Sequence, residues 1–135
     1  METVVEQELE MHLVLSPERS VPVPARLSYD THDPYAVHIT FHLGSDAPVT
    51  WVFARDLLAQ GTTGMCGHGD VRVWSTRSKG RDVLCMALNS PAGKALLEFP
   101  PAPVEAWLER TYRLVPPGSE GDSLDLDSGL AELLT

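Results

Sequence analysis

The stretch Tyr35-Ala-Val-His-Ile-Thr-Phe-His-Leu43 decides the fold class of this chain. Four apolar side chains alternate in it with three polar ones: Val37, Ile39, Phe41 and Leu43 against His38, Thr40 and His42. Period-two alternation is typical of a β-strand with one face on the core and one towards solvent, because successive side chains point to opposite faces. We therefore predict a strand here, in an antiparallel sheet with one wet face.

The same period-two alternation predicts further strands before and after this one. An earlier strand is indicated by Leu9, Met11, Leu13 and Leu15, which alternate with Glu8, Glu10 and His12, and a later one by Val49, Trp51 and Phe53. Residues 71–75 and 83–88 predict a hairpin that turns at Ser78-Lys79-Gly80. Because residues 83–88 are apolar at every position, that strand should be central and covered on both faces, by helices or by another subunit.

Turns and helices complete the expected order of elements. Pro22, Pro24 and Asp33-Pro34 predict turns or edge positions. A short helix over residues 54–60 should end at a left-handed Gly61, and residues 61–69 should form a glycine-rich loop. Ser90-Pro91 is typical of a helix start. Helical spacing then recurs in two apolar sets, which are Val104, Trp107, Leu108, Thr111 and Val115, and Leu126, Leu130, Leu133 and Leu134.

Strands over about residues 3–90 and helices over about 91–134 predict one α+β domain that spans residues 1–135. The net charge of −9, from 19 acids and 10 bases, disfavours general binding to nucleic acid or anionic lipid. No signal peptide and no membrane span is recognisable, which predicts an intracellular protein whose two cysteines stay reduced.

A search for chemistry predicts no metal, no cofactor and no catalytic residue. His38 and His42 would lie about 13 Å apart on a strand, too far to share one ion. Cys66 and His68, with His32 or Asp33, are too few and too scattered for a zinc prediction. The sequence contains no Gly-x-Ser-x-Gly nucleophile elbow. It also lacks the phosphate-binding motif Gly-x-Gly-x-x-Gly, because after Gly67 and Gly69 the third glycine would have to stand at position 72, which is Arg. We therefore expect no enzyme.

The most suggestive local feature is a basic hairpin. Arg77, Lys79 and Arg81 cluster at its expected tip, with Trp74 nearby. A cationic tip beside an aromatic ring suits an acidic protein partner, and it would also suit single-stranded nucleic acid. A solvated tip without a function is the third interpretation of the same residues.

Several stretches resemble one family throughout the chain, in the same order and spacing. They are Pro22-Val-Pro-Ala-Arg-Leu-Ser-Tyr-Asp-Thr31, Asp33-Pro-Tyr-Ala-Val-His38, Trp51-Val-Phe-Ala-Arg-Asp-Leu-Leu-Ala59, Gly69-Asp-Val-Arg-Val-Trp74 and Ser90-Pro-Ala-Gly93. These are similar to the SsgA-like regulators of sporulation and cell division in filamentous actinobacteria, and within them to the SsgB subgroup.

The resemblance implies a function that composition does not. Such proteins help to position the tubulin-like GTPase FtsZ at sporulation septa, together with an SsgA-like partner. The family implies no enzymatic activity and no cofactor. It also implies a cytoplasmic protein concentrated at the septum, with an antiparallel-sheet fold that resembles Whirly-type proteins and forms a homotrimer. Fold similarity alone does not carry nucleic-acid binding across, so single-stranded nucleic-acid binding stays the alternative function.

Overall fold

Eight antiparallel strands form one sheet in the computed structural model, which describes residues 3–44, 47–67 and 69–123. The order across the sheet is β4-β3-β2-β1-β8-β7-β6-β5. The strands are β1 (Val4–Ser16), β2 (Arg19–Asp30), β3 (Ala36–Phe41), β4 (Val49–Ala54), β5 (Met65–Cys66), β6 (Val71–Ser78), β7 (Arg81–Ser90) and β8 (Gly93–Phe99). Three helices accompany them in these residues: α1 (Arg55–Gly61), α2 (Pro101–Leu114) and α3 (Glu120–Ser123). The predicted α+β class on antiparallel sheet is confirmed.

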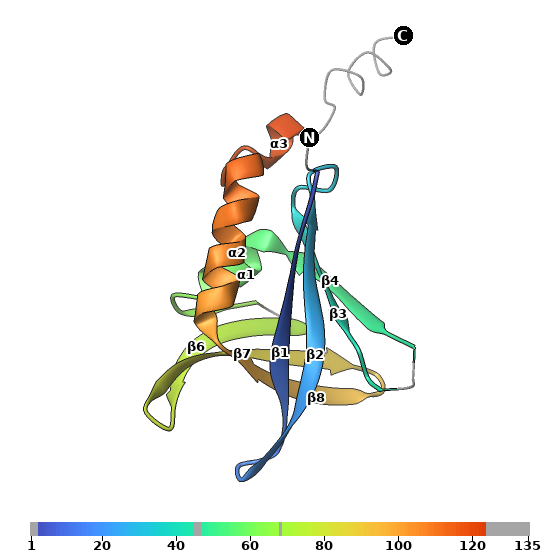
Figure 1. The fold of residues 1–135 in the computed structure, drawn as a ribbon, viewed down its shortest axis with the longest axis vertical. Coiled ribbons are helices and arrows are strands. Elements are labelled where there is room, and N and C mark those ends of the chain that lie inside the picture. The colour runs from blue at the N-terminus through green and yellow to red at the C-terminus, as the bar shows by residue number, and fades with distance from the viewer. Residues whose placement is uncertain (1–2, 45–46, 68, 124–135) are drawn as a thin grey trace.

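The sheet consists of two halves that meet at a narrow junction. Strands β1 to β4 form one half and β5 to β8 the other, and between β1 and β8 only His12 and Leu13 pair, with Glu98 and Leu97. Figure 1 shows β6, β7 and β8 running across the direction of β1 and β2, with α1 and α2 together on one side of the sheet. We call the side that faces these helices the inner face, and the opposite side of β1, β8, β7 and β6 the outer face.

Hydrophobic alternation places the core on the inner face as predicted. Met11, Val37, Ile39, Phe41 and Phe53 are all buried in one core. The alternation overreaches at strand ends, where Leu15 is 52% exposed, Leu43 is 42% exposed and Val49 is 41% exposed.

Helix α2 closes the inner face with the residues that the helical spacing selected. Val104, Trp107, Leu108 and Thr111 are its buried residues, and Val115 just after it is also buried. The indole Nε1 of Trp107 donates a hydrogen bond to the carbonyl oxygen of Val5 at 3.1 Å. A buried Trp needs such a partner for its N–H.

The prediction of helix from residue 91 is wrong, because residues 93–99 form strand β8. Ser90 pairs with Gly93 across a tight turn that contains Pro91, and Gly93 has a φ of 145°. A proline after a serine suits a turn as well as a helix start. Helix α2 starts instead at Pro101, again with proline in the first turn. The predicted apolar stripe from Leu126 to Leu134 lies outside the described residues.

Pro22 and Pro24 lie inside β2 and not in turns. They oppose His12 and Glu10 of β1. On the other side the residue pairing of β2 with β3 begins at Ala25, and the Pro24 carbonyl oxygen still accepts from the His42 N–H at 2.9 Å. Pro22 therefore lies on a local edge of β2, and Pro24 lies at the end of the β2–β3 ladder. The missing proline N–H groups therefore interrupt no ladder, and of the two alternatives the edge position is correct. Asp33-Pro34 does lie in the turn between β2 and β3.

The segment from Gly61 to Gly69 also differs from the predicted loop. Gly61 ends α1 in helical conformation and not in the left-handed one, and a Cβ on it would meet Val73 Cγ1 at 2.4 Å. Glycine is needed here for the close approach of α1 to β6. Met65 and Cys66 then form the short strand β5, which pairs with Trp74 and Val73.

Candidate partner-binding surface

Strand β7 is central as predicted, but among the described residues only one of its faces is covered. It lies between β6 and β8, and its inner residues Leu84, Met86 and Leu88 are buried in the core. Val83, Cys85 and Ala87 point to the outer face, where the described chain places no helix. Cover by another subunit, the second predicted alternative, stays a prediction.

The register of the sheet gathers aromatic, aliphatic and cationic side chains on this outer face. Trp74 lies opposite Cys85, and Arg72 lies opposite Ala87. On the other side of β7, Ala87 lies opposite Leu96 of β8, and Asn89 opposite Lys94. Arg72, Trp74, Lys94 and Leu96 therefore share one face although they come from two strands that are not neighbours.

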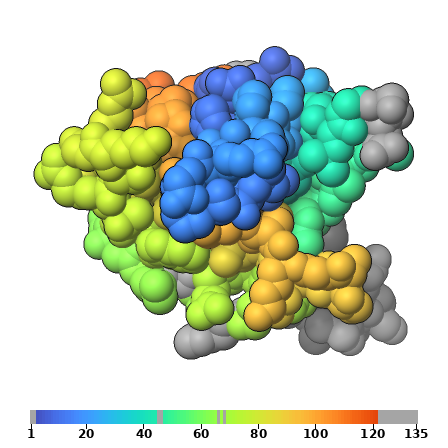
Figure 2. All heavy atoms as spheres, turned by 90° about the horizontal axis from the view of Figure 1, so that it is seen from below, coloured from blue at the N-terminus to red at the C-terminus, as the bar shows by residue number. Residues whose placement is uncertain are grey.

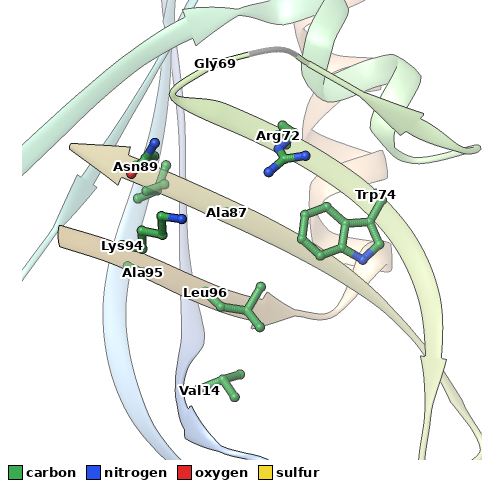
Figure 3. A pocket seen from close by; sticks show the side chains of 10 residues that line it. Val14, Gly69, Arg72, Trp74, Ala87, Asn89, Lys94, Ala95 and Leu96 are labelled. Atoms are coloured by element: carbon green, nitrogen blue, oxygen red, sulfur yellow. The ribbon is translucent and has the colours of Figure 1, made fainter. Parts of the chain in front are cut away.

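These side chains surround a shallow hollow of about 380 Å³, which we call the Trp74 hollow. Figure 3 shows Arg72 and Trp74 of β6 on one side of it and Lys94 and Leu96 of β8 on the other. Val14 of β1 completes its apolar lining. No carboxylate is among the described residues that line it.

A second depression, the hairpin groove, lies between the tips of the β1–β2 and β6–β7 hairpins. Figure 2 shows the two tips side by side at the lower end of the molecule. The groove has a volume of about 510 Å³ and is lined by three cations, Arg19, Lys79 and Arg81. Two carboxylates, those of Glu18 and Glu98, also line it, so the positive charge of this groove is partly offset.

The structure divides the predicted site residues between these places. Trp74 lines the Trp74 hollow, whereas Lys79 and Arg81 line the hairpin groove. Arg77 holds the turn itself, because its guanidinium donates to the carbonyl oxygen of Gly80 at 2.9 Å and lies 3.8 Å from Asp82. Lys79 and Gly80 have φ values of 53° and 78°, as a type I′ turn requires. The predicted hairpin is thus confirmed, and the binding role of its residues stays a prediction.

Reading along the sequence placed Arg72 only beside the basic hairpin and did not select Lys94, although both line the hollow with Trp74. Neither forms an ion pair in the described part of the chain, and the same holds for Lys79 and Arg81. Lys94 is twenty positions from Trp74 in the sequence, and only the pairing of β6, β7 and β8 places both side chains on the outer face. In a chain of net charge −9 this gives a local excess of cations among the described residues that line the Trp74 hollow.

Below this face lies Cys85, whose thiol has low reactivity. Cys85 is buried, and burial followed by the nearby Glu98 carboxylate raises the pKa of its thiol to about 11. It is therefore a protonated thiol near neutral pH and a poor nucleophile. Within residues 3–44, 47–67 and 69–123 no three His, Cys, Asp or Glu side chains stand close enough to hold a metal ion.

No helix in the described part of the chain combines the length and the apolar character that crossing a bilayer demands.

The most heavily buried charge, Arg55, also escaped prediction. Its side chain is 2% exposed, and its guanidinium carbon lies 4.8 Å from the ring centre of Tyr29 and 5.0 Å from that of Tyr112. It donates to the carbonyl oxygen of Val115 at 2.7 Å and to Glu120 Oε1 at 2.8 Å. These contacts fix the end of α2 and the start of α3 against α1, which is a structural role.

Taken together, the fold and this surface define an α+β protein whose outer sheet face presents apolar and cationic side chains around two depressions. Comparison with known proteins then identifies the family. The family model described as Streptomyces sporulation and cell division protein, SsgA, matches residues 23–120. The chain belongs to this SsgA family.

Individual relatives agree along nearly the whole chain. The sporulation-specific cell division protein SsgB of Streptomyces coelicolor is 56% identical over 134 residues, which cover 99% of this chain and 98% of that protein. SsgB of Thermobifida fusca is 41% identical over 133 residues, with 98% and 96% covered.

Two solved structures share the fold. The structure from work on SsgB mutations that correlate with longitudinal cell division in Streptomyces coelicolor superimposes with a TM-score of 0.87 at 56% identity, over 90% of this chain and 96% of that one. The crystal structure of the SsgA-like sporulation-specific cell division protein from Thermobifida fusca gives 0.86 at 42% identity, over 96% and 95%.

Proposed function

We propose that this protein is a non-enzymatic regulator of sporulation-specific cell division that binds FtsZ, together with an SsgA-like partner, and positions it at septum sites. The observation that carries the proposal is the outer sheet face with its two depressions, where apolar side chains lie beside cations that form no ion pair within the described residues, in a chain that belongs to a family of cell division proteins. Apolar surface flanked by cations suits an acidic protein partner, since opposite charge steers association and burial of apolar area sustains it.

The proposal includes a homo-oligomer, expected to be a Whirly-like trimer in the cytoplasm with no cofactor. Half-buried Val83 and Ala87 on the outer face support an oligomer, because an apolar sheet face left in water is normally covered by a partner. Nothing in the proposal requires insertion into a membrane.

Co-sedimentation with FtsZ from the same organism, with and without GTP, tests the function. We expect the protein to pellet only when FtsZ filaments form. Lys79→Glu with Arg81→Glu should lower the pelleted fraction several-fold without lowering the melting temperature, because both side chains are exposed and neither holds the turn. Arg113→Glu, exposed on α2 away from the outer face, is the matched control. A protein that stays in the supernatant well above micromolar concentration would refute direct FtsZ binding.

Single-stranded nucleic-acid binding is the second candidate. One observation favours it, since Trp74 shares the hollow with the cations Arg72 and Lys94, which resembles a stacking platform with cations nearby. The net charge of −9 opposes it. A filter-binding titration at low salt separates the two functions, because nucleic-acid binding would weaken steeply as salt rises.

A further inference from the structure

The Trp74 hollow has a defined chemical preference. Its lining is mainly apolar, with Arg72 and Lys94 at its margin and no carboxylate among its described residues. An apolar cavity of about 150 Å³ already takes a benzene-sized group, so 380 Å³ accommodates more than one leucine side chain. The hollow therefore fits a segment that presents leucines together with acids, and it fits such a segment better than the hairpin groove, which contains Glu18 and Glu98.

The chain itself carries such a segment at its C-terminus. Residues 124–135 contain five leucines and three acids, and no lysine or arginine. They are Leu124, Leu126, Leu130, Leu133 and Leu134, and Asp125, Asp127 and Glu132. This composition complements the charge and the apolar character of the hollow in both respects.

The position of α3 decides which copy of the chain supplies the segment. Glu120 is bound to Arg55 among the helices, so α3, the last described element before the segment, lies on the inner side. The hollow lies on the outer face. Twelve residues span about 40 Å at most, and in the same chain they would have to pass around the sheet. A neighbouring copy has no such restriction.

We propose that residues 124–135 of one copy dock into the Trp74 hollow of a neighbouring copy, with leucines on Trp74 and Leu96 and acids beside Arg72 and Lys94. This inference rests on the homo-oligomer of the proposed function. It assigns to the acidic C-terminal segment the role of linking subunits.

The chain offers a sharp test because Lys79 and Lys94 are its only lysines. A carbodiimide joins an amine to a carboxylate that contacts it. Full-length unlabelled and ¹⁵N-labelled protein are mixed, re-equilibrated and cross-linked, and the products are mapped by mass spectrometry. We expect mixed-label products that join Lys94 to Asp125, Asp127 or Glu132, with at least a fivefold excess over products of Lys79. Lys79 is the internal control, since it is exposed but lies in the hairpin groove.

Two variants of the full chain separate docking from chance proximity. Arg72→Glu leaves the Lys94 amine in place but reverses the charge beside it, and Leu130→Asp with Leu133→Asp removes apolar contacts. Each should lower the Lys94 product at least fivefold. Leu15→Asp, an exposed leucine at the tip of the β1–β2 hairpin, should leave it unchanged.

Several results would overturn the proposal. Equal yields at both lysines, Lys94 products confined to a single label, or yields that the leucine variants do not alter would each do so. Sedimentation velocity on the same sample then shows whether tail docking alone or also the homo-oligomer is refuted. An oligomer without the Lys94 product refutes tail docking and leaves the oligomer standing, whereas a monomer refutes the proposed homo-oligomer as well. Neither result bears on binding to FtsZ.

Discussion

Arg55 shows how one charge can be buried when both terminal nitrogens of its guanidinium donate hydrogen bonds. Tyr29 and Tyr112 flank its guanidinium, and the end of α2 and Glu120 take its hydrogen bonds. Within the described chain no buried side-chain nitrogen or oxygen lacks a hydrogen-bond partner. Removing one member of such an arrangement leaves the other buried and unpaired, which costs far more than the pair contributes on balance.

Glu120→Gln tests this arrangement through pH. The hydrogen bond from Arg55 holds the pKa of the Glu120 carboxyl below its usual value. A carboxyl with a lowered folded-state pKa contributes stability above the unfolded-state pKa of about 4.3, and this is lost as pH falls through the folded-state pKa. We expect Glu120→Gln to cost about 2 kcal/mol at pH 7 in urea unfolding, and the difference from the unmutated protein to shrink below about pH 4.3.

The control is Glu105→Gln on the exposed side of α2, where no ion pair is formed among the described residues. It should change stability by less than about 0.5 kcal/mol. A Glu120→Gln deficit that stays constant down to pH 3 would show that packing and not charge stabilises this end of α2.

At the scale of elements, the approach of α1 to β6 depends on the absence of a side chain. Gly61→Ala would place a Cβ 2.4 Å from Val73 Cγ1 and 3.0 Å from the Val73 carbonyl oxygen, so the backbone of β6 must shift. We expect a loss of about 1–3 kcal/mol, measured by urea unfolding. Gly64→Ala is the matched control, since nothing lies within 4 Å of a Cβ there. Equal stability of the two variants would mean that α1 moves freely on the sheet.

Elements were predictable from the sequence where burial on one face dominated. The alternation over residues 37–41 and the helical spacing from Val104 to Val115 both select the buried side chains, because one face of each element meets the core. Proline was less informative, since Pro91 suits a turn as well as a helix start and Pro22 suits a strand that lacks a neighbour at that point.

The candidate site was only half predictable for a different reason. Trp74 could be selected as an aromatic residue near a basic hairpin. The cations that share the hollow with it, Arg72 and Lys94, are placed there by the register of three strands. Burial of Arg55 depends on two tyrosines and Glu120, whose positions relative to it are fixed only in the folded chain.

At the scale of the whole molecule, cooperative unfolding depends on how the two half-sheets are connected. Strands β1 and β8 join them through only two residue pairs, which is a weak junction for two four-stranded halves. Helix α2 adds a further connection to the shared core, because it contacts β1 of one half and β7 of the other. Its buried Trp107 reaches the backbone of Val5 in β1.

Trp107→Ala should therefore weaken both halves together. We expect a loss of about 3–5 kcal/mol, since a fully buried aromatic side chain is removed. If α2 couples the two halves, the unmutated protein should unfold in one transition, seen alike by circular dichroism and by tyrosine fluorescence. In the Trp107→Ala variant this transition should broaden or divide into two. Val52→Ala, at a side chain that is 54% exposed on β4, should cost less and leave a single transition. A Trp107→Ala protein that unfolds in one sharp transition would show that the β1–β8 junction is sufficient, and that α2 stabilises the sheet without coupling its halves.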